Sequence, residues 1–313
     1  MRAWHVERRT ARSLAIPAFL VVAGILGAFR FLNVYPWNSR VFDLHTYWAT
    51  RFGLDYASQP GPAGAYLYSP AFAQLIAPLA ALPLPVFATI WTLVTAGLLY
   101  WLTGRWAIVV ALIPAVALTI AQGQLDLAFA VVIVLGFRWP ALWAFPILTK
   151  VTPGVGIVWF LVRREWRSLM VAVASTIAIV AVSAFLDPHA WRGWIEMLGR
   201  SDHPPVGTNL VYLPIALGYR LPLALAIVAW GAATSRRWTI PIAVTLAMPI
   251  LWLNSPTILV AIFPMIALGA TAPAAAWLRS HPLGAPETDA ATDAIDEKPA
   301  LDRVGARVTF PSA

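Results

Sequence analysis

Cysteine is absent from this 313-residue chain, which excludes disulfide bonds and any metal site built from thiolates. Several catalytic signatures are missing as well, since the sequence contains no GxxxxGK[ST], GxGxxG, HExxH or GxSxG motif. It therefore shows no machinery for nucleotide hydrolysis, zinc proteolysis or serine hydrolysis. We predict neither a metal-ligand set nor an organic cofactor, and dependence on a divalent metal stays open.

Charge is also scarce along the chain. Only 12% of the residues are charged, against about 25% in soluble domains, while 60% are hydrophobic and the mean hydropathy is +0.72. Apolar runs recur throughout, so we expect an all-α polytopic integral membrane protein with about ten transmembrane helices. The net charge of +8 comes mainly from arginines in short connectors. This is the pattern of the positive-inside rule and does not indicate nucleic-acid binding.

The distribution of arginine predicts how the chain is oriented. Arginines at positions 2, 8, 9 and 12 predict a cytoplasmic N-terminus, followed by an uncleaved anchor helix over residues 14–31 that runs outward. A transmembrane domain is expected over residues 1–278. It should include a first extracytoplasmic loop with juxtamembrane helices, residues 40–83, and a second large outer loop, residues 187–220. The second loop has amphipathic character around residues 191–198. Residues 279–313 lack periodicity and predict a disordered cytoplasmic tail.

The short apolar segment over residues 66–82 allows two arrangements of the helices that follow it. If it crosses the membrane, Arg105 and Arg138 face outside. If it lies at the outer leaflet, both arginines face the cytoplasm and the 122–126 turn faces outside, which the charge rule favours. In this favoured arrangement, further spans are predicted over residues 86–103, 107–121, 127–137, 139–149, 151–162, 166–186, 221–234, 238–253 and 257–277.

In the favoured arrangement, polar residues that interrupt the apolar pattern gather at the outer face, where ionisable groups are costly and often functional. Asp43, within FDLHTYW, either caps a short surface helix or is a general base made more basic by its aromatic neighbours. Gln124 and Asp126, within AQGQLD, either form a helix cap or line a pocket. Lys150, the only lysine before the tail, either anchors a helix end or binds an anion such as a phosphate.

Two more residues of the first loop are candidates for binding a substrate, and each has a plainer structural interpretation. Asp55 has the same alternatives as Asp43, with less support from its surroundings. His45 fits an interfacial histidine at least as well as a ligand.

The order of these features resembles that of a known family. The early loop aspartate is followed by YLYSP at residues 66–70, by GQLD at residues 123–126, and by KVTP at residues 150–153 before a helix that ends in basic residues. This order resembles glycosyltransferase family 87, the bacterial polyprenyl-phosphate-mannose-dependent mannosyltransferase-like proteins of the GT-C superfamily. The resemblance covers roughly residues 41–166.

The resemblance implies a GT-C-like helical bundle in the bacterial cell (plasma) membrane, with both termini cytoplasmic. It implies inverting transfer of a sugar, with mannose expected, from a polyprenyl-phosphate donor to a hydroxyl of a lipid or glycan acceptor at the extracytoplasmic face. The family's loop aspartate maps onto Asp43 as the general base. The leaving phosphate needs cationic stabilisation, for which Lys150 is the expected group and Arg51 a helper. Aromatic side chains expected to contact the sugar or the prenyl chain are Trp48, Tyr66 and Tyr68.

Two other classes of function stay open at the level of sequence. A polytopic transporter or lipid flippase fits the number of spans, but it should show repeated halves with discontinuous helices in matching positions, and neither is visible. The other class is a non-catalytic membrane scaffold, because isolated aspartates alone are weak indicators of catalysis.

Overall fold

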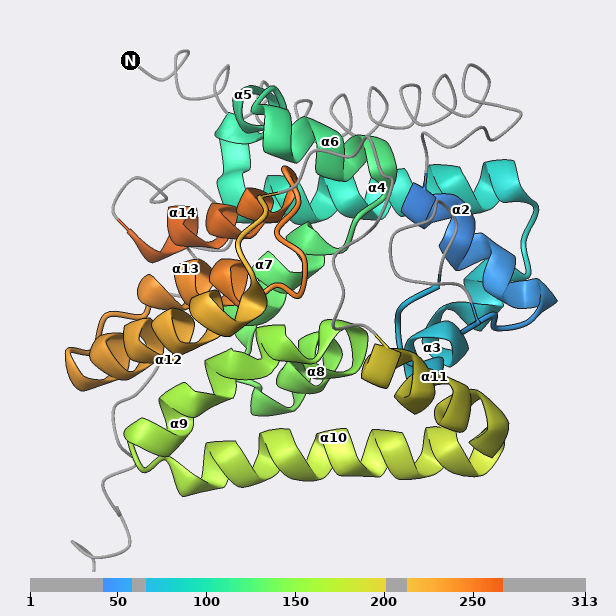
Figure 1. Cartoon of the computed structure of the whole chain (residues 1–313). Helices are drawn as coiled ribbons and strands as arrows, with labels where there is room; N and C mark the ends of the chain where they lie inside the picture. Colours follow the sequence, from blue (N-terminus) through green and yellow to red (C-terminus); the bar gives the residue numbers. More distant parts are fainter. Residues whose placement is uncertain (1–41, 58–65, 201–212, 267–313) are drawn as a thin grey trace, which may run out of the picture.

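In a computed structural model of the chain, the described residues are 42–57, 66–200 and 213–266, and every element in them is a helix (Figure 1). The prediction of an all-α protein is confirmed. The α-helices are α2 (Phe42–Ala49), α3 (Pro70–Ala80), α4 (Leu84–Thr103), α5 (Ala107–Ala111), α6 (Pro114–Gln122), α7 (Asp126–Leu135), α8 (Ala144–Lys150), α9 (Val158–Val162), α10 (Trp166–Leu186), α11 (Pro188–Arg200), α12 (Leu217–Ala233), α13 (Thr239–Leu246) and α14 (Ile262–Met265). The 3-10 helices are η1 (Thr50–Phe52), η2 (Gly104–Trp106), η3 (Pro140–Trp143), η4 (Thr152–Ile157) and η5 (Ser255–Ala261).

The predicted helix over residues 14–31 and the predicted tail over residues 279–313 lie outside the described residues. Within the described part, two helical segments are long and apolar enough to cross a membrane. One covers residues 84–111 and consists of α4, η2 and α5, and the other is α10. Helices α6 and α7 meet at an angle of 106° and count as a third span if the bent pair is taken as one. The prediction of about ten spans included several short ones, and shorter apolar helices occur in the described part over residues 70–80, 152–162, 217–233 and 255–265.

Prolines account for several differences between the predicted and the observed helices, because proline lacks an N–H donor and clashes with the preceding helical turn. The run predicted as one helix over residues 107–121 is broken after Ala111 and resumes at Pro114. The run predicted over residues 238–253 forms only α13, which ends three residues before Pro249. The run predicted over residues 166–186 contains no proline, and it forms α10 with those bounds.

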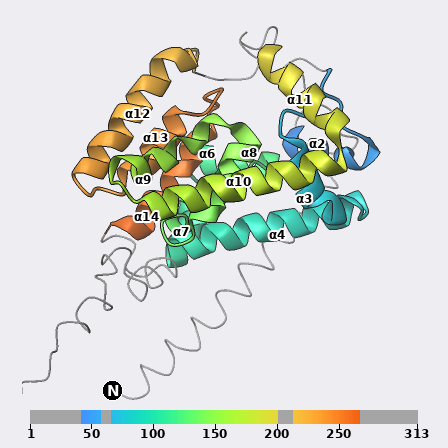
Figure 2. The same cartoon turned by 90° about the horizontal axis from the view of Figure 1, so that it is seen from below.

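Helix α10 leaves most of its apolar surface uncovered. Only 11% of its most apolar window is buried inside the protein, and Phe185 has 88% of its surface exposed. Figures 1 and 2 show the helix running along the outside of the bundle as one straight element. A long apolar helix with so little burial is what contact with lipid hydrocarbon requires.

Helices α12 and α13 pack against each other on the side of the protein away from α2 and α3 (Figures 1 and 2). The side chain of Arg220 in α12 is buried, with 4% of its surface exposed. Its guanidinium donates hydrogen bonds of 2.6–3.0 Å to three carbonyls at and just after the end of α13, those of Leu246, Met248 and Pro249. Carbonyls at a helix end lack partners within the helix, so Arg220 fixes the chain that leads from α13 to η5.

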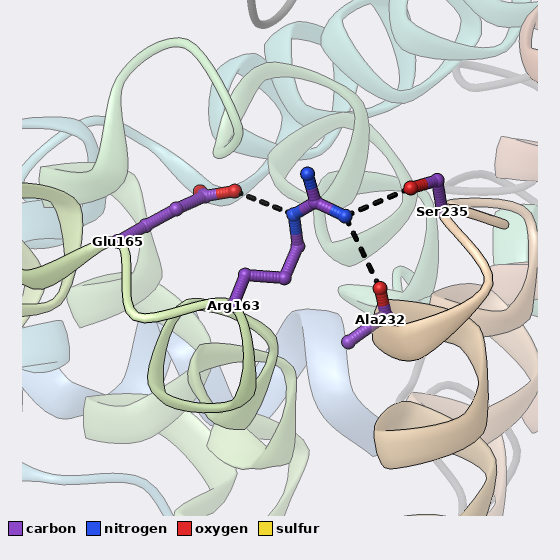
Figure 3. Close-up of polar contacts among 4 residues, drawn as sticks. All are labelled: Arg163, Glu165, Ala232 and Ser235. Atoms are coloured by element: carbon purple, nitrogen blue, oxygen red, sulfur yellow. Dashed lines mark hydrogen bonds and ion pairs between the residues drawn. The ribbon is translucent and has the colours of Figure 1, made fainter. Parts of the chain in front are cut away.

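Arg163 joins two turns (Figure 3) at the end of α10 that lies away from α2 and α3 (Figure 1). Its guanidinium donates to the carboxylate of Glu165 at 2.8 Å, to the hydroxyl of Ser235 at 2.8 Å and to the carbonyl of Ala232 at 3.1 Å. These contacts link the α9–α10 turn to the end of α12. The pair is about one-third exposed, so water screens its charges, and its role is to hold the turns together more than to stabilise the fold.

Helix α11 confirms the amphipathic helix that the sequence indicated around residues 191–198. Its N-terminus is capped by Asp187, whose carboxylate accepts the backbone N–H of Ala190 at 2.9 Å. Its inner face is buried, and the Trp194 indole donates to the Leu67 carbonyl at 3.3 Å. Arg200 at the end of the helix donates to the carbonyl of Tyr56 at 2.7 Å. Helix α11 therefore packs against the first loop and helps to hold it.

Candidate active site

Asp43 is the second residue of α2, where a carboxylate interacts favourably with the positive end of the helix dipole. This position is inside the first turn, whereas a capping aspartate precedes the first helical residue. The side chain of Asp43 is partly buried. The face of α2 formed by Leu44 and Tyr47 is fully buried, with 1% and 0% of the surface exposed. Burial of this face holds the helix, and with it Asp43, against the rest of the protein.

The turn between α6 and α7 packs directly on α2. Gly123 ends α6 with a φ of 72°, a left-handed conformation that glycine adopts without strain. A Cβ added to Gly123 would lie 2.8 Å from the Cβ of Leu44, so a larger residue would force the turn and α2 apart. The close approach brings the two polar side chains of the turn, Gln124 and Asp126, next to α2.

Asp126 is completely buried and is held through one of its two oxygens. The side-chain amide of Asn254 donates to Asp126 Oδ2 at 2.6 Å, and the hydroxyl of Thr119 donates to the same atom at 3.3 Å. Thr119 also lies 2.9 Å from the hydroxyl of Thr257 in η5. The other oxygen, Asp126 Oδ1, and the side-chain oxygen of Gln124 are buried without a hydrogen-bond partner among the described residues. Such atoms are costly to leave unpaired, and hydroxyl groups of a ligand would satisfy them.

Lys150 is the last residue of α8, and its ammonium lies 5.9 Å from the ring centroids of both Tyr68 and Phe129. It forms no ion pair with a carboxylate in the part of the chain that the structure describes. The next residue, Val151, has a φ of 56°, which is a strained conformation for a β-branched residue. Strain of this kind costs roughly 1–3 kcal/mol and gathers at functional sites.

The four polar side chains face one another closely enough to interact electrostatically. Burial raises the pKa of Asp43 to about 6, and the charge of Asp126 contributes to the rise. The ammonium of Lys150 and the side-chain amide of Gln124 lower the pKa of Asp43 in part. The structure thus brings together one residue from α2, two from the α6–α7 turn and one from the end of α8. A carboxyl group with a pKa near 6 is mostly ionised at neutral pH and is more basic than an ordinary aspartate, as a general base requires.

Two buried tyrosines border this group. The hydroxyl of Tyr47 donates a hydrogen bond of 2.9 Å to the hydroxyl of Tyr68. Burial raises the pKa of both phenols well above the usual value, and the negative charge of Asp43 raises both further. Both side chains therefore stay protonated at neutral pH and can donate hydrogen bonds.

Arg51 and Trp48 both contact the chain just after α3. Arg51 and the Trp48 indole both donate to the carbonyl of Leu82, at 3.2 and 2.9 Å. The Arg51 guanidinium also lies 5.3 Å from the rings of Trp48 and Phe52. These contacts tie α2 and η1 to the end of α3. A part for either side chain in substrate binding stays a prediction.

The other candidates of the first loop also make local contacts. Asp55 is exposed and accepts the backbone N–H of Ala57 at 2.9 Å, which is a turn contact typical of aspartate. The ring of His45 lies 5.8 Å from that of Trp48. Tyr66 is buried, and its hydroxyl donates to the carbonyl of Ser69 at 3.1 Å. The proposed binding roles of these residues are untested.

Four residues that help to form the site were not among the predicted site residues: Tyr47, Thr119, Asn254 and Thr257. Asn254 carried a weak signal, since it lies in a polar Asn-Ser-Pro connector between two apolar runs. The two threonines carried none, because threonines are frequent in apolar helices, where they bond to a carbonyl of the preceding turn. Their partners lie far away in sequence and become visible only in the fold.

A match to glycosyltransferase family 87 extends over residues 66–280, which is more than half of the chain. The chain belongs to glycosyltransferase family 87. A curated relative, from Mycolicibacterium smegmatis, is a polyprenol-phosphate-mannose-dependent alpha-(1-2)-phosphatidylinositol pentamannoside mannosyltransferase that is 24% identical over 237 residues. The alignment covers 64% of this chain, which spans 57% of the length of that relative. No solved structure matches the chain.

The family 87 match includes the turn with Gln124 and Asp126, the end of α8 with Lys150, and the connector with Asn254. Asp43 lies before its first residue, Tyr66. The predicted family is therefore confirmed by a match that includes the later part of the site, whereas the role of Asp43 as a general base stays a prediction.

Proposed function

We propose that this chain is a membrane glycosyltransferase that moves a sugar, mannose, from a polyprenyl-phosphate donor to an acceptor hydroxyl of a lipid or glycan. Family membership supports the reaction class, and the name of the mycobacterial relative supports both the donor and the sugar. The observation that carries the proposal is that Asp43 and Lys150 lie close enough to interact electrostatically. Asp43 is a partly buried carboxyl group, and Lys150 is a cation that has no ion-pair partner among the described residues.

The proposed reaction is a single displacement at the anomeric carbon. Asp43 accepts the proton of the acceptor hydroxyl while the oxygen of that hydroxyl forms the new glycosidic bond. The bond between the anomeric carbon and the phosphate oxygen breaks, and polyprenyl phosphate leaves with the electron pair. Attack from the side opposite the leaving group inverts the anomeric configuration. The leaving phosphate is a weak base, so it needs a nearby cation, Lys150, and no proton donor.

Asp126 and Gln124 are proposed to receive sugar hydroxyls. Each has one buried side-chain oxygen without a partner among the described residues, and hydroxyl donors would complete both. The bonds from Asn254 and Thr119 hold the carboxyl group of Asp126 in one orientation. Recognition of a hydroxylated substrate thereby falls to the α6–α7 turn, and the proton transfer to α2.

The proposed place of the reaction is the extracytoplasmic face of a bacterial cell membrane, with both termini cytoplasmic. The apolar helices support a membrane protein, and the arginines near the α9–α10 and α12–α13 turns support a cytoplasmic position for that end of the bundle.

The test is transfer from labelled polyprenyl-phosphate mannose by purified protein in membranes that contain candidate lipid and glycan acceptors. We expect label to move covalently into an acceptor, and an Asp43→Asn variant expressed to the same level to lose this transfer. A transporter or flippase would instead move intact donor between leaflets without forming a new glycoside. Movement of that kind, without any product, would overturn the proposal.

A further inference from the structure

The tyrosines of the first loop direct their hydroxyl hydrogens in different ways. Tyr56 donates to the backbone carbonyl of Tyr68 at 2.9 Å, and Tyr66 donates to the carbonyl of Ser69 at 3.1 Å. Carbonyls are pure acceptors, so these two bonds hold the backbone of the YLYSP segment and use up the hydrogens concerned. The third bond joins two hydroxyls, because Tyr47 donates to Tyr68 at 2.9 Å.

Two hydroxyls joined by one hydrogen bond have one hydrogen left for a further acceptor. With Tyr47 as the donor this hydrogen belongs to Tyr68, whose side chain is buried with 6% of its surface exposed. No acceptor for it occurs among the residues that the structure describes. A hydroxyl that already accepts a hydrogen bond is polarised and becomes a better donor. The Tyr47–Tyr68 pair is therefore a buried donor without its acceptor.

The surroundings of Tyr68 indicate which acceptor fits. The ammonium of Lys150 lies 5.9 Å from the centre of the Tyr68 ring, and it also lacks an ion-pair partner in the described ranges. Asp43 is close enough for its charge to act on Tyr68, but no hydrogen bond joins the two described side chains. A neutral O–H donor and a cation near each other match the charge and the several acceptor oxygens of a phosphate group.

We propose that the Tyr68 hydroxyl, oriented by Tyr47, donates a hydrogen bond to a phosphate oxygen of a lipid-linked substrate beside Lys150. This inference rests on the proposed function and adds a neutral donor to its phosphate site. The phosphate has two possible sources, the monophosphate of the polyprenyl donor and the phosphodiester of a phospholipid acceptor. Tyr68 is in either case a binding residue and Tyr47 a positioning residue.

The test measures equilibrium binding of polyprenyl monophosphate and of the matching polyprenol to the full-length protein in nanodiscs. A separate arm measures binding of phosphatidylinositol. The variants are Tyr68→Phe and Tyr47→Phe, which keep the rings and remove one hydroxyl each. Tyr56→Phe is the matched control, since it removes a phenol–carbonyl bond to the same segment. Thermal unfolding of each variant reports separately on the fold.

Loss of a hydrogen bond to a charged group predicts about 10- to 100-fold weaker phosphate binding in Tyr68→Phe. Tyr47→Phe, which removes only the orienting bond, should weaken it by about two- to fivefold. Binding of polyprenol, and all binding by Tyr56→Phe, should stay within about twofold of wild type. Weakening confined to polyprenyl monophosphate assigns the donor phosphate, and weakening confined to phosphatidylinositol assigns the acceptor phosphodiester.

Unchanged phosphate binding in a folded Tyr68→Phe variant would overturn the inference, even if its transfer rate fell and its pH profile moved. That combination would mean that the hydroxyl acts on Asp43 instead. A wild-type protein that binds polyprenyl monophosphate no better than polyprenol would have no site for the donor phosphate at all. The proposed function itself would then fail, which distinguishes its failure from that of the Tyr68 assignment alone.

Discussion

The substitution Asp43→Asn tests the catalytic base most directly. Asparagine has almost the same size and shape as aspartate and keeps the first turn of α2 intact, because Asp43 lies inside the helix. It cannot accept the proton of an acceptor hydroxyl. A positioned general base contributes about 10²- to 10⁴-fold to a rate, so we expect a loss of transfer in that range with donor binding retained.

The pH dependence of the wild-type rate gives an independent magnitude. Burial raises the pKa of Asp43 to about 6, with Asp126 contributing to the rise and with Lys150 and Gln124 opposing it. The base is active only when ionised, so the rate must fall as the pH falls through this value. A single titration with this pKa leaves roughly 90% of the base active at pH 7 and about 10% at pH 5. We therefore expect a rate about tenfold lower at pH 5 than at pH 7.

The assay is transfer from labelled donor between about pH 4.5 and 8 at donor concentrations well below KM, so that the rate reports kcat/KM and the titration of the ligand-free protein, to which the pKa of about 6 belongs. Circular dichroism at each pH excludes unfolding as the cause of a loss. An acid limb centred near 4, the value of an ordinary aspartate, would mean that the group titrating in the reaction is not this buried carboxyl group. Near-normal transfer by Asp43→Asn would remove Asp43 from the chemistry altogether.

Three further predictions concern the surroundings of Asp43. Lys150→Ala should raise KM for the donor. It should also move the fall of the rate at low pH to higher pH, because a charge that lowers the pKa of Asp43 is lost. An unchanged KM and an unchanged pH profile would make Lys150 a simple anchor. Asn254→Ala should weaken transfer by about tenfold, since Asp126 loses its shorter hydrogen bond, while a loss of fold seen in thermal unfolding would instead mark a structural role. Single cysteines, introduced into a chain that has none, should label from the cytoplasm at Arg105 and from outside at Gln124; the reverse labelling would put the α6–α7 turn on the cytoplasmic side.

Sequence patterns predicted the elements whose formation depends on local properties. The bounds of α10 follow from an apolar run without proline, and α11 follows from its two-faced pattern. Elements interrupted by proline were predicted too long, as at Pro114 and Pro249. Hydropathy averages over a window and does not register where a single missing N–H ends a helix.

The residues of the candidate site also differ in how far the sequence alone could predict them. Asp43, Asp126 and Lys150 stood out because ionisable residues are rare in an apolar chain, and the structure brings them into electrostatic contact. Asp55 stood out for the same reason, yet its carboxylate binds the backbone two residues on. Tyr47 did not stand out, because its partner hydroxyl is 21 residues away in sequence. The type of residue indicates which groups are unusual, whereas only the tertiary contacts determine which of them meet.

The positions of the unpaired polar atoms add an argument that neither sequence nor family membership contains. Three of the buried side-chain atoms without partners in the described part of the chain belong to segments that form the site: Ser69 Oγ, Gln124 Oε1 and Asp126 Oδ1. Each such atom costs roughly 1–3 kcal/mol, and a protein without a ligand here would gain stability by replacing them with apolar groups. Asn254 and Thr119 instead hold Asp126 with its second oxygen free. Hydroxyl donors, such as those of the sugar proposed to bind at the α6–α7 turn, would satisfy the oxygens of Gln124 and Asp126.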